Sequence, residues 1–116
     1  MKAITYSSHG SPAAFRCEEI AKPTAGDNDV LIAVRAASVN PLDWRLKASR
    51  PGRDVAGQVE AVGRNITRFK PGDEVFGTCP GAFAEYACAS ESALAMKPAN
   101  VTFEQAASVP VAALTA

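Results

Sequence analysis

The chain has 116 residues, of which 47% are hydrophobic and 21% are charged, and its formal net charge at pH 7 is zero. These values are typical of one soluble globular domain and exclude a disordered chain. A balanced charge favours neither nucleic acid nor an anionic membrane as a partner, and no apolar window approaches the roughly 18 residues of a membrane span.

The first third of the chain has the pattern of a β protein. Alternating apolar residues predict three strands, at residues 2–6, 15–20 and 30–39. Between the second and third strands, a stretch rich in proline, glycine and asparagine predicts a loop over residues 22–28. In the third strand, we expect one face to carry Val30, Ile32, Val34 and Ala36.

A short helix is predicted next, beginning at Asn40. Asn40 suits the N-cap, Pro41 suits the first helical position, and Asp43 complements the positive end of the helix dipole. The stretch from Ser49 to Gly52 breaks this helix.

Glycines at the turns organise the middle of the chain. They are Gly52, Gly57, Gly63, Gly72 and Gly77. Pro71-Gly72-Asp73 predicts a tight turn, because proline presets φ and glycine accepts a positive φ. Alternating residues around these glycines predict four strands, at 54–63, 73–77, 82–89 and 93–97.

A second helix is predicted to open at Thr102. Thr102 and Gln105 have the spacing of a capping box, and Pro110 predicts a break near Ser108. The elements together predict a mainly β domain, a partly open β-barrel with two or three short helices.

The glycine-rich stretch also carries a family resemblance. GRDVAGQVEAVG followed by FKPGDEVFG is similar to the signature of the GroES-like catalytic domain of medium-chain dehydrogenases/reductases. Four further segments fit the same pattern in the same order: MKAITY, VLIAVRAASVNPLDW, GAFAEYA and TFEQAASVPVAALTA. The resemblance spans nearly the whole chain, residues 1–116, and its nearest branch is that of the zinc-independent quinone or enone oxidoreductases.

The residues present argue against zinc. In zinc-dependent relatives, a cysteine near the start of the short helix and a histidine in a G-H-E motif hold the metal, and these positions match Asn40 and Arg53 here. Arginine offers no lone pair to a metal, so we expect no zinc site. The three cysteines lack CxxC spacing and predict buried free thiols. With no apolar leader segment at the N-terminus, they point to a cytoplasmic protein.

The resemblance also implies candidate site residues. It places Asn40 beside the nicotinamide ribose and the substrate, and Thr115 close to the nicotinamide. It places Trp44 near the wall of the substrate pocket, and Phe83, an aromatic residue on a predicted strand, is a further candidate to face that pocket. Each has a structural alternative: Asn40 is a helix cap, Trp44 and Phe83 are core residues, and the Thr115 hydroxyl bonds a carbonyl one turn back.

The chain departs from the family pattern in two ways. It ends where the family continues into the Rossmann domain that grips the cofactor, so we expect no tight NADPH binding and no turnover from this chain alone. The segment from Lys47 to Gly52 is also short, where relatives carry a longer loop beside the substrate pocket.

Two functions therefore remain open. The first is a catalytic-domain fragment of an NADPH-dependent reductase of quinones or enones, and the second is a non-catalytic scaffold or binding module. In either case, an apolar C-terminal end would promote self-association, through Val109, Val111, Ala112 and Leu114.

Overall fold

A computed structural model describes residues 1–7, 14–39 and 51–109 of the chain. Its strands are β1 (Lys2–Ser7), β2 (Ala14–Glu19), β3 (Asp29–Ser38), β4 (Asp54–Val62), β5 (Glu74–Thr78), β6 (Tyr86–Ser90) and β7 (Leu94–Met96). A 3-10 turn, η1 (Glu91–Ala93), precedes β7, and the helix α2 (Phe103–Ala107) follows it. The helix predicted from Asn40 lies outside these ranges.

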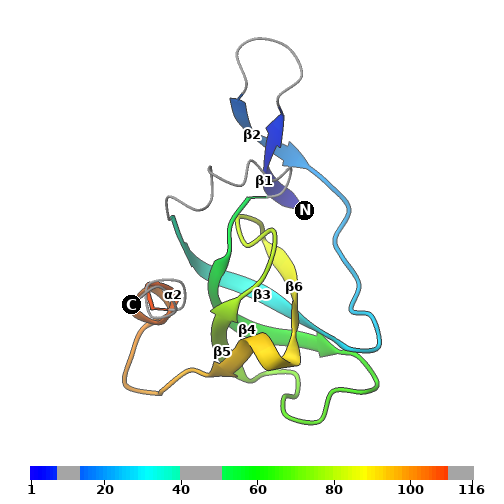
Figure 1. Ribbon diagram of the computed structural model, residues 1–116, viewed down its shortest axis with the longest axis vertical. Helices are drawn as coiled ribbons and strands as arrows, with labels where there is room; N and C mark the ends of the chain where they lie inside the picture. Colours follow the sequence, from blue (N-terminus) through cyan, green and yellow to red (C-terminus); the bar gives the residue numbers. More distant parts are fainter. Residues whose placement is uncertain (8–13, 40–50, 110–116) are drawn as a thin grey trace.

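The strands form two antiparallel sheets. Five strands pair in the order β6-β3-β4-β5-β7, and β1 pairs with β2 in a separate hairpin. The hairpin stands at one end of the molecule, and α2 lies against one side of the larger sheet (Figure 1). In the part of the chain that the structure describes, β6 and β7 are the edges of the larger sheet and do not pair with each other. This confirms the predicted mainly β, partly open barrel.

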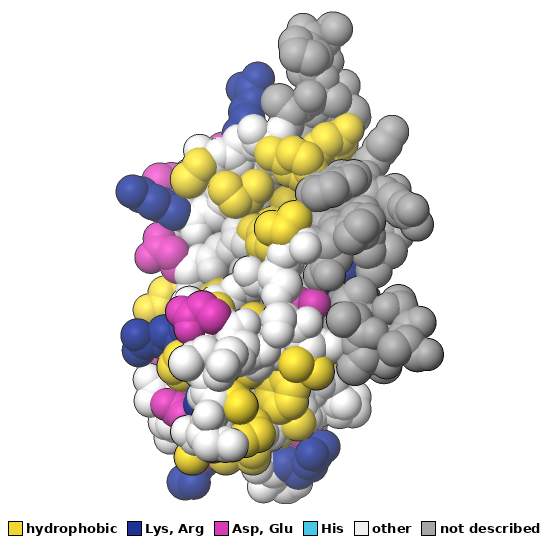
Figure 2. Space-filling view, turned by 90° about the vertical axis from the view of Figure 1, so that its left-hand side faces the viewer, with side chains coloured by type: hydrophobic (Ala, Val, Ile, Leu, Met, Phe, Trp, Pro, Cys, Tyr) yellow, Lys and Arg dark blue, Asp and Glu magenta, His cyan; other side chains and the backbone are white. Residues whose placement is uncertain are grey.

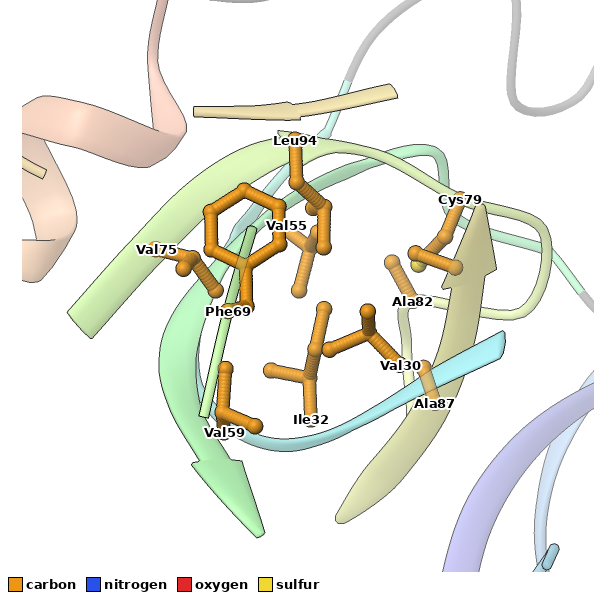
Figure 3. Close-up of a cluster of buried hydrophobic side chains, with 11 residues drawn as sticks. Val30, Ile32, Val55, Val59, Phe69, Val75, Cys79, Ala82, Ala87 and Leu94 are labelled. Atoms are coloured by element: carbon orange, nitrogen blue, oxygen red, sulfur yellow. The ribbon is translucent and has the colours of Figure 1, made fainter. Parts of the chain in front are cut away.

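The concave side of the five-stranded sheet encloses the main core. Valines, Ile32, Phe69 and Leu94 point toward one another from four strands and the loop before β5 (Figure 3). Val30, Ile32, Val55 and Val75 are each 0% exposed. Burial of such side chains contributes about 1.5–3 kcal/mol each, so this cluster dominates the stability of the barrel.

A second, smaller core lies between the sheet and α2. Ala106 and Ala107 of the helix pack on Ala56 of β4, and Phe76 and Phe103 flank this contact. Alanines on both partners let the helix approach the strand closely.

The faces predicted for β3 are partly wrong. Val30, Ile32 and Val34 contact the main core as predicted, but Ala36 packs on the second cluster and Ala37 takes its place in the first. The register with β4 shifts between Val34 and Ala36. Such a β-bulge inserts one residue and exchanges the faces beyond it.

The predicted strand at 82–89 is also too long. β6 begins at Tyr86, whereas Ala84 makes only an isolated bridge to Ala3 of the hairpin. The stretch 82–85 instead joins the hairpin to the barrel, since Glu85 N donates to Lys2 O at 3.1 Å and Ile4 N donates to Phe83 O at 2.7 Å.

The predicted turn and helix start are confirmed. Gly72 adopts φ +99° in the turn before β5. Thr102 caps α2 with a full capping box, since its side chain accepts from Gln105 N and its amide donates to the Gln105 side chain. The helix ends at Ala107, so the predicted break near Ser108 is correct. Within the described ranges, no helix has the length and apolar character needed to cross a membrane.

Candidate functional site

A cavity of about 390 Å³ opens where the hairpin meets the barrel. Its walls come from β1, Cys17 of β2, residues 34–37 of β3 and residues 82–85. Most of the lining is apolar, with Lys2, Arg35 and Glu85 as the charged residues among it. A mostly apolar hollow with few polar groups is the usual form of a small-molecule site.

Phe83, the one predicted substrate-site residue within the described ranges, lies in the wall of this cavity. The Phe83 amide donates to Pro51 O at 3.3 Å, and Ala82 N donates to Gly52 O at 3.2 Å. Gly52 adopts φ +102°, and a Cβ there would stand 2.5 Å from Phe83 N and 2.8 Å from Phe83 Cδ1. Gly52 therefore lets the chain pass in close contact with the backbone and ring of Phe83. That Phe83 contacts substrate stays a prediction.

Asn40, Trp44 and Thr115 lie outside the described residues, but Ser38 and Ala107, which precede two of them in the sequence, are hydrogen-bonded to each other. Ser38, two residues before Asn40, donates its hydroxyl to the carbonyl oxygen of Ala107 at 2.5 Å. Ala107 ends α2, and Thr115 follows eight residues later. The structure thus joins the ends of the two elements from which the candidate cofactor residues depart.

Asp54 is a buried acid at the same end of the barrel, which the sequence analysis did not select. It is 0% exposed and stands opposite Ser38 of β3 and Thr78 of β5. A carboxylate without water needs polar or charged partners, and Asp54 does interact with other groups. No local sequence signal marked it, because its burial follows from the pairing of β4 with β3 and β5, which are distant in the sequence.

The cysteines differ from one another in burial. Cys79 is buried as predicted, Cys88 is half-buried, and Cys17 is exposed, which corrects the expectation for that residue. Burial, and to a lesser extent the neighbouring Cys88, raises the pKa of the Cys79 thiol to about 12. Burial also raises the pKa of Cys88. Both thiols therefore stay protonated near neutral pH, whereas a metal binds the thiolate.

No three side chains among the described cysteines and acids come close enough to hold a metal ion. His9 lies outside these ranges, so the expected independence from zinc stays a prediction.

Gly57 of β4 and Gly63, the residue after β4, do not form a phosphate site. A Cβ on Gly57 would meet the carbonyl oxygen of Ala33, and one on Gly63 would meet that of Gly26. A phosphate cradle presents backbone N–H groups, whereas carbonyl oxygens repel an anion. These glycines therefore serve the packing of β4 and leave the pyrophosphate of a dinucleotide without a partner there.

Comparison with known proteins identifies the fold and its relatives. Residues 26–99 match the alcohol dehydrogenase GroES-like domain. The chain is 38% identical to a quinone oxidoreductase of Sus scrofa and 37% identical to a chloroplastic quinone-oxidoreductase homolog of Spinacia oleracea, over 100% of its own length.

Two solved structures match in three dimensions. A mycobacterial protein complexed with NADPH superposes with a TM-score of 0.90 at 33% identity, covering 99% of this chain and 39% of that one. The quinone oxidoreductase of Escherichia coli complexed with NADPH gives 0.88 at 26% identity, covering 99% of this chain and 39% of that one.

The lengths also differ. The chain spans 39% of the Sus scrofa protein and 40% of the Spinacia oleracea protein. The aligned spans are 129 and 133 residues, longer than the 116 residues of this chain, so both relatives carry residues that it lacks. The sequence predicts such a difference between Lys47 and Gly52. The match along the chain and the agreement of the folds lead to one conclusion: the chain belongs to the family of alcohol dehydrogenase GroES-like domains, within the medium-chain dehydrogenases/reductases.

Proposed function

We propose that the chain is the catalytic domain of a zinc-independent, NADPH-dependent oxidoreductase that transfers hydride to the conjugated carbonyl of a quinone or an enone. One observation carries this proposal. The whole chain aligns with quinone oxidoreductases, and 99% of it superposes on a quinone oxidoreductase complexed with NADPH, of which it covers 39%.

A cavity among the described residues supports this proposal. The cavity beside Phe83 is mostly apolar and large enough for a ring the size of a quinone. In this proposal Phe83 and Trp44 wall the pocket, Asn40 contacts both substrate and cofactor, and Thr115 lies against the nicotinamide. Hydride transfer without a metal then depends on positioning and on hydrogen-bond donors to the developing oxyanion.

The proposal also assigns substrate binding and cofactor binding to two separate domains. The glycines described above offer no cradle for the pyrophosphate. We therefore propose that the chain needs a separate Rossmann domain to hold NADPH, since such a domain presents N–H groups from a glycine-rich turn and a helix N-terminus. The isolated chain is expected to be inactive.

A chimera tests the proposed reaction. The segment of the Sus scrofa quinone oxidoreductase that aligns with this chain is replaced by residues 1–116. The chimera should oxidise NADPH, followed by the loss of its near-ultraviolet absorbance, only when a quinone or enone is present. A metal chelator should leave the rate unchanged, and the parent oxidoreductase serves as the control. A folded chimera that binds NADPH but reduces neither acceptor would contradict the proposal.

The second candidate is a non-catalytic GroES-like scaffold or binding module. The missing residues relative to both aligned oxidoreductases favour it, because a shortened pocket loop can abolish a substrate site. Saturable shifts of the amide signals near Asn40 and Thr115, in a titration of the isolated chain with NADPH, would favour the first candidate, whereas unchanged signals fit both and leave the decision to the chimera. Unchanged signals at millimolar cofactor, together with an inactive chimera, support the scaffold.

The cell compartment is also part of the proposal. The three free cysteines favour a reducing compartment, which we propose to be the cytoplasm. A chloroplast location, as the name of the Spinacia oleracea relative states for that protein, is the alternative that cell fractionation would reveal.

A further inference from the structure

The cavity where the hairpin meets the barrel has an irregular wall on β3. Residues 34–37 all line it. A regular strand turns successive side chains to opposite faces, so it lines a cavity with every second residue. Here Val34 and Ala36 pair with two consecutive residues of β4, and Arg35 between them pairs with none. Arg35 is therefore the extra residue of the β-bulge, a feature that often turns a side chain toward a binding site.

The same stretch of β3 is open on its other side. β6 pairs with residues 29–33, and Val34 N donates to Glu85 O at 2.9 Å, just before β6 begins. Within the ranges that the structure describes, no strand lies beside β3 on this side after Val34. Arg35 is exposed there and lines the cavity, so its side chain can reach a molecule bound between β3 and residues 82–85.

The charged residues around this cavity do not neutralise one another. Lys2, Arg35 and Glu85 line it, and the Glu85 oxygen Oε1 accepts from the backbone N of Lys2 at 2.6 Å. Among the described residues, neither the Arg35 guanidinium nor the Lys2 ammonium group belongs to an ion pair. Two cations and one carboxylate leave an excess of one positive charge beside a mostly apolar hollow.

We propose that this cavity binds a ring compound that carries a carboxylate, with the ring against the apolar wall and the carboxylate on Arg35. The planar fork of a guanidinium matches the two oxygens of a carboxylate, and it binds them more selectively than an ammonium group does. Ile4, Phe83 and several alanines form the apolar wall. The substrate class rests on the proposed function, since the reducible ring compound would be a quinone or an enone with an acidic group. The binding of a carboxylate does not rest on it.

The first measurement titrates the isolated chain with benzoate and with benzamide, which has the same ring and no charge. Benzoate should shift the amide signals of residues 34–37 and 82–85 in a saturable way. Benzamide should bind about tenfold more weakly, because hydrogen bonds to a charged group are the stronger ones. Equal affinities for the two compounds, or no shift with benzoate, would overturn the proposal.

Three variants assign the binding to one side chain. Arg35→Gln should lower the affinity for benzoate about tenfold and leave that for benzamide unchanged. Arg35→Lys keeps the charge without the fork, so its affinity for benzoate should fall between these two. Arg16→Gln is the matched control, because Arg16 is also an exposed arginine on a strand and follows Phe15 on β2, outside the described lining of the cavity. Equal effects of Arg35→Gln and Arg16→Gln would overturn the proposal.

The second measurement tests the substrate class in the chimera with the Sus scrofa oxidoreductase. A benzoylacrylate, which is an enone with one carboxylate, is compared with its methyl ester. Arg35→Gln should lower kcat/KM about tenfold for the acid and leave it nearly unchanged for the ester. Equal losses for acid and ester would overturn the substrate class. If the unmodified chimera reduces neither compound, the proposed function fails, and the benzoate titration alone decides whether Arg35 binds a carboxylate.

Discussion

Gly52 shows how one residue without a side chain shapes the candidate pocket. Gly52 adopts φ +102° and lies in close contact with the backbone and ring of Phe83. Two separate constraints act on it, since a Cβ would be strained by the backbone conformation and would also collide with Phe83.

Replacing Gly52 by alanine should therefore destabilise the chain more than the same change at Gly72. Gly72 has a similar φ of +99°, but no atom lies within 4 Å of the position of its Cβ. We expect the free energy of unfolding to fall by about 1 kcal/mol in Gly72→Ala, because of backbone strain alone. It should fall by about 3 kcal/mol in Gly52→Ala, because overpacking adds to that strain. Urea denaturation measures both, and ring-proton shifts of Phe83 should change only in Gly52→Ala. Equal losses in the two variants would contradict the assigned contact.

The Cys79 thiol should make the free energy of unfolding depend on pH in the alkaline range. Burial raises the pKa of its thiol from 9.0 to about 12 in the folded chain. Between these two values the folded state holds a proton that the unfolded state has released. The contribution of this thiol to the free energy of unfolding is therefore fully present below about pH 9 and is lost as pH rises toward about 12.

The prediction compares the wild-type chain with Cys79→Ala, because other groups titrate alike in both. From about pH 8 to about pH 10, the free energy of unfolding should fall by about 1.4 kcal/mol more in the wild type. Denaturation curves at the two pH values measure this difference. Parallel pH dependences in the two proteins would show that the thiol titrates normally in the fold.

At the scale of elements, features that depend on neighbouring residues could be predicted from the sequence, whereas features that depend on distant residues could not. The capping box at Thr102, the turn at Gly72 and the end of α2 depend on neighbouring residues, and each was predicted correctly. The bulge in β3 depends on its partner β4, and alternation within one strand gives no sign of it.

The candidate site follows the same division. Phe83 was selected as an aromatic residue on a predicted strand, and it lines a cavity, but its contact with substrate stays a prediction. The hydrogen bond from Ser38 to Ala107 and the burial of Asp54 arise from residues distant in the sequence, so no local pattern could predict them.

The short helix α2 should depend strongly on its cap. Helices this short are marginal by themselves, and Thr102 satisfies the Gln105 amide at 3.1 Å. Thr102→Ala should cost about 1 kcal/mol, and amide hydrogen exchange of Ala106, which bonds to Thr102 O, should accelerate. Thr102→Ser keeps the accepting oxygen and is the control. Unchanged exchange at Ala106 in Thr102→Ala would show that packing on β4 alone holds the helix.

At the scale of the whole molecule, one side of the barrel buries its hydrophobic side chains, whereas another side leaves some of them exposed. The main core is enclosed by the five-stranded sheet, whereas the side that carries α2 shows hydrophobic side chains at its surface among charged ones (Figure 2). Val109, just beyond α2, is 46% exposed, and Met96 of β7 is 53% exposed. In a two-domain reductase such a surface would be a place for a neighbour to pack.

We therefore predict that the isolated chain self-associates through its C-terminal apolar segment, of which Val109 is the described part. Sedimentation equilibrium should show an average mass that rises with protein concentration. Val109→Lys should lower the association constant about tenfold, because a loss of about 1.4 kcal/mol of apolar burial corresponds to that factor.

Phe15 provides the control for this prediction, because it is almost equally exposed, at 45%, but lies on the hairpin. Phe15→Lys should leave the association constant unchanged if the contact is made by the C-terminal segment. An equal fall of the association constant in both variants would assign association to general surface hydrophobicity. A constant monomer mass of the wild type at all concentrations would contradict the prediction. In the chimera with a cofactor domain, the same surface should be covered, so Val109→Lys should no longer alter the average mass.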